Sequence, residues 1–334
     1  MNDGSFGFFH DWLREFAKST QVTVLAFEVG EYNLPGVQVF SLGKDRSKNK
    51  LIWLCNLYRY TWRERKTYNT VFAHMSPLFV ILPYPLFCIL RKKIVLWYVH
   101  RNVDLKLRIA EKIVSKVFTA TPESFGIPSK KVMYMGQAVD VDRFYSTNLE
   151  RLNDKKEFRV ITVGRITPIK NLDILIEAVA LISREVPIVV DVIGITATEQ
   201  DLAYETMLKK MVMDKGLGRQ VRFVGSVANR DLVEQFARAH ASINLSPTGG
   251  LDKTVLESMA SGVPVFVSNQ AFIEHLGKYA ADLMFPERDV VALAKLFTDL
   301  YARKDLPEIG RYLQAQAREK SSLDRLIKNI VENV

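Results

Sequence analysis

The sequence predicts an α/β protein made of two doubly wound, parallel-sheet domains. Three observations support this expectation. In the second half of the chain, short apolar segments alternate with segments of helical periodicity, and several apolar segments end in glycine. Repeated β-α units of this kind form parallel sheets with helices on both faces. The 334 residues suffice for two domains, and a polar stretch at residues 145–157 is the expected linker between them.

The composition is that of a folded protein in a reducing compartment. Hydrophobic residues make up 48% and charged residues 25% of the chain, which are globular values. Cys55 and Cys88 stand in apolar surroundings and predict neither a disulfide framework nor a metal cluster. The first five residues lack the basic and apolar regions of a signal peptide. We therefore expect a cytoplasmic protein.

The first half is expected to begin with a helix rather than a strand. Apolar faces and apolar runs predict helices at 8–18, 50–68 and 106–115, and strands at 21–27, 37–41, 70–75, 93–100, 117–121 and 132–135. A doubly wound domain normally starts with a strand before its first glycine loop, and no such strand precedes Gly4. We expect the first strand to be missing, the natural start to lie upstream, and the sheet to hold an unpaired position.

Residues 75–90 contain no formal charge, which raises the question of a membrane span. The segment is shorter than the roughly 20 residues that a span needs, and Pro77, Pro83 and Pro85 interrupt it. We expect a buried loop and helix, with contact at a membrane surface as the alternative.

The second half alternates more regularly. Strands are predicted at 158–163, 188–193, 221–224, 241–245 and 265–268, and helices at 171–179, 199–215, 230–239, near 272, at 288–303 and along the tail from 310 to 334. Because the carboxyl ends of parallel strands meet at one sheet edge, that edge should collect Gly164, Arg165, Gly194 and Gly225.

The segment from Leu245 to Pro264 is the most informative one. A strand end, the pair Gly249 and Gly250, and a helix that starts at Asp252 predict an anion site, because unpaired backbone N–H groups and the helix dipole converge there. Glu257, one turn into the helix, could reach the hydroxyls of a sugar or ribose. The alternative is an ordinary β-α turn with a solvated glutamate.

Two basic residues are expected beside this loop. Arg165 and Lys170 could both reach a diphosphate and stabilise charge on a leaving phosphate; alternatively both are merely solvated. No Asp-x-Asp metal pair stands at a strand end, no His/Cys cluster has ligand spacing, and no Walker motif or strand-linked G-x-G-x-x-G is present. We therefore expect no metal site and no bound cofactor.

The positive charge lies in the first half. The chain has 46 Lys and Arg against 37 Asp and Glu, but residues 1–150 hold 21 against 13 and the rest 25 against 24. A basic half predicts an anionic partner, such as a membrane surface, a phosphorylated lipid or a nucleic acid; the alternative is a solvated basic face without a specific partner. Nucleic acid is disfavoured, since no compact patch interleaved with aromatic residues is visible.

Several segments together resemble the retaining family 4 glycosyltransferases of the GT-B fold, in which two Rossmann-like domains face each other across a cleft. The segments are VGRITPIKNLDILIEA, VRFVGSV, LESMASGVPV, WYVH and MGQAVDVDRF. The resemblance covers nearly the whole chain. It implies an acceptor domain at 1–150, a donor domain at 151–310, and a final segment at 311–334 that packs back toward the first domain.

The resemblance also implies roles for individual residues. Arg165 and Lys170 would hold the donor diphosphate beside Gly164, and the N–H groups of Leu251, Asp252, Lys253 and Thr254 would cap its phosphates. Glu257 would accept from the ribose hydroxyls, Gly225 and Val227 would take the base, and His100 would contact the transferred sugar. The donor would be a UDP- or GDP-sugar, and the acceptor a glycan or a lipid-linked molecule, in polysaccharide or glycolipid biosynthesis.

One position departs from the family pattern of two glutamates separated by seven residues. The first position is Gly249 instead of glutamate, and Asp252 is a nearby candidate to replace it. Two hypotheses therefore stay open: a metal-independent retaining hexosyltransferase, peripheral on the inner face of the membrane, and a degenerate, non-catalytic binder of nucleotide sugars.

Overall fold

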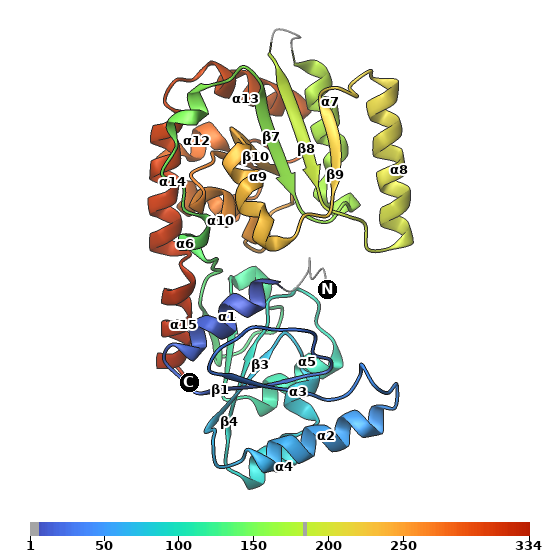
Figure 1. Ribbon diagram of the computed structural model, residues 1–334, viewed down its shortest axis with the longest axis vertical. Coiled ribbons are helices and arrows are strands. Elements are labelled where there is room, and N and C mark those ends of the chain that lie inside the picture. The colour runs from blue at the N-terminus through green and yellow to red at the C-terminus, as the bar shows by residue number, and fades with distance from the viewer. Residues whose placement is uncertain (1–6, 183–185) are drawn as a thin grey trace. The chain divides into compact units, whose positions relative to one another are not determined.

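A computed structural model describes residues 7–182 and 186–334 (Figure 1). The chain divides into two compact units. Among the described residues, the first contains 7–137 together with Leu323–Val334, and the second contains those of Ala138–Ser322. The glycine loop expected from Gly4 lies, except for Gly7, outside the described residues.

The first unit has an α/β order. Its elements are α1 (Gly7–Ala17), β1 (Val22–Ala26), β2 (Val37–Ser41), α2 (Lys50–Arg63), β3 (Thr70–His74), α3 (Leu78–Ile81), α4 (Tyr84–Ile89), β4 (Lys93–Trp97), α5 (Leu105–Ile113), β5 (Lys116–Thr119), the 3₁₀ turn η1 (Pro122–Ser124), β6 (Val132–Tyr134) and α15 (Leu323–Glu332). All pairings are parallel: β1 pairs with β2, and β3, β4, β5 and β6 form a sheet in that order. Among the described strands, β1 and β3 each have one partner.

Aromatic packing fixes α1 on the larger sheet. The Trp12 ring is 2% exposed and lies 4.8 Å from the Trp97 ring of β4, edge to face. Phe16 packs on Phe72 of β3 with ring centroids 5.5 Å apart. Such aromatic pairs add to the stabilisation from burial alone.

Two predicted boundaries in this unit were wrong. The helix from Lys50 ends at Arg63, five residues earlier than predicted. Just beyond it, the Lys92 ammonium donates to the carbonyls of Arg65 and Tyr68 and holds the chain in a turn. β4 ends at Trp97, so His100 lies beyond the strand in an isolated bridge with Phe125. The uncharged stretch forms the short helices α3 and α4, but it is only partly buried, since Leu82, Tyr84 and Ile89 are exposed.

The second unit is larger. Its elements are α6 (Val141–Phe144), η2 (Glu150–Asn153), β7 (Phe158–Val163), η3 (Pro168–Lys170), α7 (Leu172–Leu181), β8 (Ile188–Ile193), α8 (Glu199–Asp214), β9 (Val221–Gly225), η4 (Asn229–Asp231), α9 (Leu232–Arg238), β10 (Ala241–Asn244), α10 (Lys253–Ala260), β11 (Val265–Val267), η5 (Gln270–Phe272), α11 (Ile273–Leu276), η6 (Gly277–Tyr279), α12 (Ala280–Leu283), α13 (Val290–Ala302) and α14 (Leu306–Lys320).

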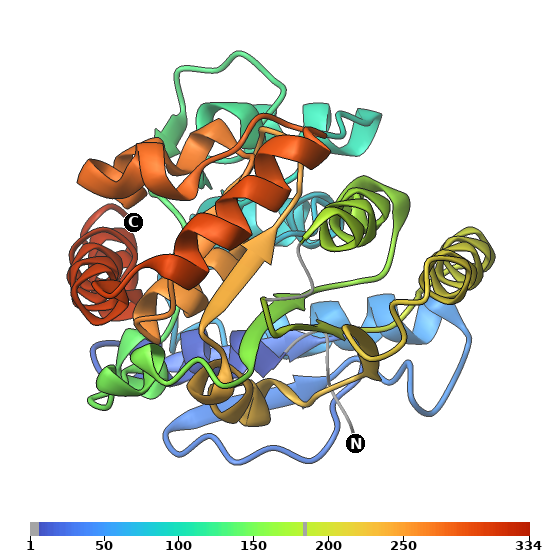
Figure 2. The ribbon, with the colours of Figure 1, turned by 90° about the horizontal axis from the view of Figure 1, so that it is seen from above.

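Its five strands form one parallel sheet in the order β11-β10-β7-β8-β9. Figure 2 shows α7, α8 and α13 on one face of this sheet and α9 and α10 on the other. The strands β7, β8 and β10 are largely buried on both faces, as apolar central strands of parallel sheets are. The expected α/β architecture is therefore confirmed, and its switch point lies between β7 and β10.

The division between the units lies at Gln137 and Ala138 and not at residue 150. The polar stretch chosen as linker carries Leu149 and Leu152, which are 3% and 0% exposed and belong to the core of the second unit. At the other end, the predicted continuous tail helix is two helices broken at Ser321 and Ser322, and α15 belongs to the first unit.

Candidate functional site

The carboxyl edge of the second sheet is shaped by glycines. Gly164 and Gly194 follow β7 and β8 and both have φ of 150°. The Gly194 amide donates to the Gly225 carbonyl at 2.8 Å, and a Cβ on Gly194 would lie 1.8 Å from the Gly164 carbonyl oxygen. Only glycine allows three neighbouring strand ends to approach this closely.

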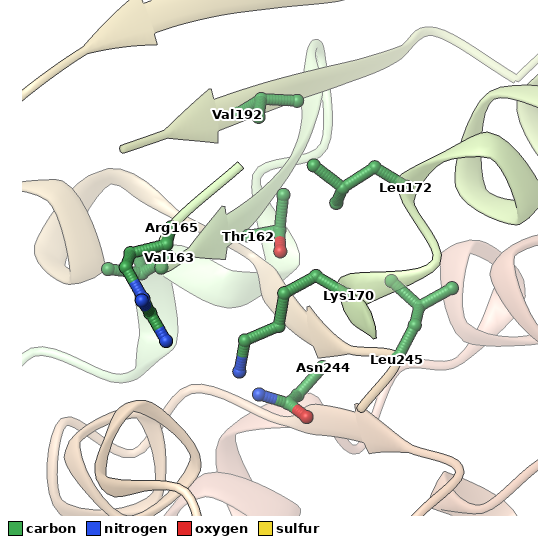
Figure 3. Close-up of a pocket in the computed structure, with 9 residues that line it drawn as sticks. Thr162, Val163, Arg165, Lys170, Leu172, Val192, Asn244 and Leu245 are labelled. Atoms are coloured by element: carbon green, nitrogen blue, oxygen red, sulfur yellow. The ribbon is translucent and has the colours of Figure 1, made fainter. Parts of the chain in front are cut away.

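A narrow pocket, about 10 Å³ in volume, lies at this edge beside β7 (Figure 3). Its lining consists of Thr162, Val163, Gly164, Arg165, Lys170, Leu172, Val192, Asn244 and Leu245. Arg165 is exposed at the rim, and the Lys170 ammonium points toward Asn244 on β10. The two basic residues predicted to act together therefore do line one pocket, since both stand between β7 and α7.

Lys170 is held by a network of polar side chains. Its ammonium donates to Ser246 Oγ and to Asp252 Oδ2, each at 2.8 Å. Asp252 Oδ2 also accepts from Ser246 Oγ at 2.7 Å and from Asn244 Nδ2 at 2.8 Å. Burial by itself would raise the pKa of Asp252, but the Lys170 charge and these hydrogen bonds outweigh it and lower that pKa. Asp252 is thus an anion paired with a cation.

This network corrects the expected role of Asp252 as a side-chain helix cap. Asp252 does stand at the N-cap position of α10, with φ of −69° and ψ of 127°, but its carboxylate bonds none of the helix N–H groups. The reason is competition: an ammonium is a stronger partner for a carboxylate than a backbone amide. The cap position is therefore filled by a side chain that faces the pocket residues.

The loop before α10 is fastened to the end of β11. Asn269, which is 1% exposed, donates to the Gly250 carbonyl at 3.0 Å and accepts from the Gly249 amide at 3.3 Å. The Gly249 amide, predicted to belong to the ring of donors around an anion, is thus already used within the loop. Leu251 is 8% exposed and packs in the core. Lys253 and Thr254 form the first turn of α10, where N–H groups lack helical acceptors.

The remaining predicted residues lie away from the pocket lining. Glu257 lies in the buried middle of α10 and is 5% exposed. Gly225 ends β9, with φ of 84°, and the half-buried Val227 packs against the core. His100 belongs to the first unit, where its Nδ1 accepts from the Asn102 amide at 3.0 Å. The functions assigned to these residues remain predictions.

Sequence analysis missed three polar residues that build the site: Asn244, Ser246 and Asn269. Asn244 is 5% exposed at the end of a fully buried strand, which is an unusual place for an amide. A polar residue at the end of an otherwise apolar strand was the available signal. Asn269 gave none, because its contacts join segments about twenty residues apart.

The described residues hold neither a metal-binding cluster nor a membrane-spanning helix. They contain no group of three or more His, Cys, Asp and Glu side chains arranged to hold a metal ion. No helix in the described ranges has the length and apolar character needed to cross a bilayer.

Comparison with known proteins places these features in a family. A family model described as "Glycosyl transferases group 1" matches residues 147–320. A mannosylfructose-phosphate synthase of Agrobacterium fabrum is 25% identical over 174 residues, covering 49% of this chain and 38% of the relative. A D-inositol 3-phosphate glycosyltransferase of Streptomyces coelicolor is 33% identical over 171 residues, covering 48% and 35%. The match thus spans well under half of these relatives' length.

Solved structures match over nearly the whole chain. Anabaena HepE, crystallised in complex with UDP, has a TM-score of 0.79 at 18% identity and covers 99% of this chain and 96% of its own. Sucrose-phosphate synthase of Thermosynechococcus elongatus has a TM-score of 0.75 at 16% identity, covering 97% and 91%. This similarity confirms the GT-B fold that the sequence predicted.

Proposed function

Because the chain belongs to the group 1 glycosyltransferases, we propose that it transfers a hexose from a nucleotide sugar to an acceptor hydroxyl with retention of anomeric configuration. The observation that carries the proposal is the placement of Arg165 and Lys170 on one pocket at the carboxyl edge of a parallel sheet. Ligands of open α/β sheets bind outside this edge, at the switch point. A relative in fold, Anabaena HepE, was crystallised with UDP and with UDP-glucose, which supports a UDP-linked donor, with a GDP-linked sugar as the other option.

The chemistry needs positive charge where the sugar leaves. When the bond between the anomeric carbon and the diphosphate oxygen breaks, negative charge grows on the leaving phosphate. Arg165 at the rim would donate to it, and Lys170 has three N–H groups, two of which bond Ser246 and Asp252. The third is left for a phosphate oxygen. One preorganised contact of this kind is worth about a hundredfold or more in turnover.

We propose that the negative charge on the leaving diphosphate is stabilised without a metal ion. Two cationic side chains and the first turn of α10 would together offset a diphosphate. Turnover should then be unchanged by a chelator such as EDTA and by added Mg²⁺ or Mn²⁺. A loss of turnover with EDTA that Mn²⁺ restores would overturn this part of the proposal.

For the acceptor we propose a glycan or a lipid-linked molecule of polysaccharide or glycolipid biosynthesis. The basic first unit would work at an anionic membrane surface, with the enzyme peripheral on the cytoplasmic face. The support is the charge of the first 150 residues, which hold 21 Lys and Arg against 13 Asp and Glu.

The donor can be identified with a panel of UDP-, GDP- and ADP-sugars screened by thermal shift. We expect one nucleotide sugar to raise the unfolding midpoint, since a ligand that binds only the folded state stabilises it. Product formation from that donor and a membrane extract, with the anomeric configuration read by NMR, then tests retention. An inverted product would refute retention alone, and no product would favour the second hypothesis.

That second hypothesis is a non-catalytic binder of nucleotide sugars, and two observations favour it. Gly249 stands where the family has a glutamate, and its amide is used by Asn269. Lys170 is already paired with Asp252. Calorimetric binding without hydrolysis or transfer of the same donor would identify a binder, and turnover would exclude it.

A further inference from the structure

The net charge of the chain is confined to one segment. Residues 44–93 hold 11 Lys and Arg and only two acidic residues, Asp45 and Glu64. The rest of the chain then carries 35 basic and 35 acidic residues, so the whole formal charge of +9 belongs to this segment. It contains α2, α3 and α4 of the first unit. The basic residues lie at 44–66, in and around α2, and at 91–93 after α4, while α3 and α4 carry none. Clustered charge of one sign creates a local field that attracts anions.

The solvent side of α2 is apolar where a globular helix should be polar. Leu51, Cys55, Tyr58 and Trp62 follow one another at i, i+4, i+7 and i+11, which places them on one stripe. Leu51 is 68% exposed and Trp62 51%, and Ile52 beside them is 43% exposed. The opposite side of the helix buries Leu57 and Thr61. Leu57 and Thr61 thus pack within this unit, while Leu51, Ile52 and Trp62 are exposed apolar residues of the same helix.

Helices α3 and α4 continue the same surface. The Tyr58 hydroxyl on the stripe donates to the Leu82 carbonyl at 2.8 Å, which places the α3–α4 corner against α2. The Lys92 ammonium donates to the Arg65 carbonyl at 2.7 Å, which places the end of α4 against the end of α2. Exposed side chains on this second part are Leu82 (40%), Tyr84 (39%) and Ile89 (75%).

We propose that this surface, the α2–α4 face, docks the protein on an anionic lipid bilayer. The face comprises Leu51, Ile52, Trp62, Leu82, Tyr84 and Ile89, and the basic residues of 44–66 and 91–93 flank them in the sequence. It specifies the membrane partner of the proposed function and rests on that proposal for its purpose, although not on the chemistry of glycosyl transfer.

A bilayer fits the mixture of side chains better than a nucleic acid or a protein partner does. Aliphatic Leu51, Ile52 and Ile89 cannot stack on bases, but they can enter the boundary between headgroups and acyl chains. Trp62 has the Arg65 guanidinium 4.4 Å from its ring centroid, a pair suited to the interface, where an aromatic body meets lipid and a cation meets phosphate. The short helices α3 and α4 and the absence, within the described residues, of a helix able to span a membrane match a face that lies on the surface.

The binding experiment is flotation of the full chain with vesicles of phosphatidylcholine alone and with about 30 mol% phosphatidylglycerol, a mixture that carries a negative surface potential. We expect flotation only with the anionic vesicles, weakened but not abolished at high salt, because the charge contribution is screened and the apolar contribution is not. Equal flotation with both vesicles, or none with either, would overturn the proposal.

Two variants separate the two contributions. Leu51→Ser with Trp62→Ser should lower the apparent partition coefficient at least tenfold and remove the part that survives high salt. Arg59→Glu, Lys66→Glu and Lys93→Glu together should lower it about a hundredfold at low salt, since each Lys or Arg near the surface adds roughly a factor of five.

Matched control variants come from the second unit. Leu202→Ser with Met213→Ser changes two side chains that are 57% and 79% exposed on α8. Lys210→Glu, Arg219→Glu and Lys304→Glu together make the same change in net charge at exposed positions. We expect the apolar control to float like the wild type and the charge control to lose less than tenfold. Equal losses in the face and control variants would mean that net charge alone, and not this face, binds the vesicle.

The same protein preparations distinguish the two proposals. Every variant should keep the wild-type unfolding midpoint and bind UDP with wild-type affinity, since the face lies outside the pocket. Face variants that no longer float but still bind UDP support the face. A wild-type protein that does not bind UDP counts against the proposed donor site and leaves the flotation result unaffected. Binding of a duplex oligonucleotide in place of vesicles would refute the bilayer in favour of nucleic acid.

Discussion

The ion pair between Lys170 and Asp252 offers a quantitative test of the site. We consider Lys170→Met and Asp252→Asn, which keep the shapes of the side chains, and the variant that carries both. The two charged atoms are 2.8 Å apart, and the side chains are 24% and 32% exposed. The pair therefore lies between exposed pairs, worth up to about 1 kcal/mol, and buried ones, whose disruption costs about 3–5 kcal/mol.

Because the bond is charge-assisted and partly desolvated, we expect a coupling energy of about 2 kcal/mol at pH 7. Lys170→Met alone should lower the free energy of unfolding by about that amount, since it leaves Asp252 charged with only Ser246 and Asn244 as donors. In the Asp252→Asn background the same change should cost little. The pKa of Asp252 is lowered in the folded state, so its contribution is present above the ordinary value of 3.8 and is lost as pH falls through the lower folded value.

The assay is urea unfolding of the four proteins at pH 7, analysed as a double-mutant cycle, and its repetition at acid pH. A coupling that fades below the folded pKa of Asp252 would confirm the pair. Additive effects at pH 7 would refute the reasoning: Lys170→Met would then lower the free energy of unfolding equally in the wild type and in the Asp252→Asn protein.

Three further predictions concern the second unit. Gly194→Ala should cost more than about 3 kcal/mol, because its Cβ would lie 1.8 Å from a main-chain oxygen, whereas Gly218→Ala, with open space around it, should be neutral or slightly stabilising in the same denaturation experiment. Burial, with help from Lys320, lowers the pKa of His275 to about 4, so stability should fall by up to about 3 kcal/mol as pH drops from 6.5 to 4; a His275→Gln protein that loses as much would contradict this. Asn269→Leu should weaken UDP binding by more than the accompanying drop in the unfolding midpoint explains, because it frees the loop at Gly249. Unchanged affinity by calorimetry would show that the loop does not contribute to binding.

Elements governed by local pattern could be predicted from the sequence. The strands Phe158–Val163 and Ile188–Ile193 were placed to the residue, because both are apolar runs bounded by turns. Arg165 and Lys170 line one pocket because both stand between β7 and α7, while parallel topology brings the ends of β8 and β10 to the same edge. Boundaries set by distant contacts could not be found. The helix that ends at Arg63 stops because of Lys92, and residues 145–157 belong to the second unit because Leu149 and Leu152 are buried there.

The same distinction holds for the site. Asp252 was correctly placed at a helix start, but the direction of its carboxylate depends on Lys170 and Asn244, which lie on other segments. No local pattern reports such a choice between a backbone amide and a distant ammonium. The exposed stripe on α2 was hidden for a similar reason: its periodicity shows two apolar sides, and only the structure shows which one is buried.

The central claim is that Arg165 and Lys170 hold the diphosphate of a nucleotide sugar, and titration calorimetry with UDP and GDP tests it most directly. We predict that the wild type binds one of the two, and that Arg165→Ala and Lys170→Met each weaken binding about tenfold or more, the equivalent of roughly 1.4 kcal/mol. Arg219 precedes the amino end of β9, at the sheet edge opposite the pocket, so Arg219→Ala should bind UDP or GDP like the wild type. Unchanged affinity in both pocket variants, or an equal loss in the control, would contradict the account.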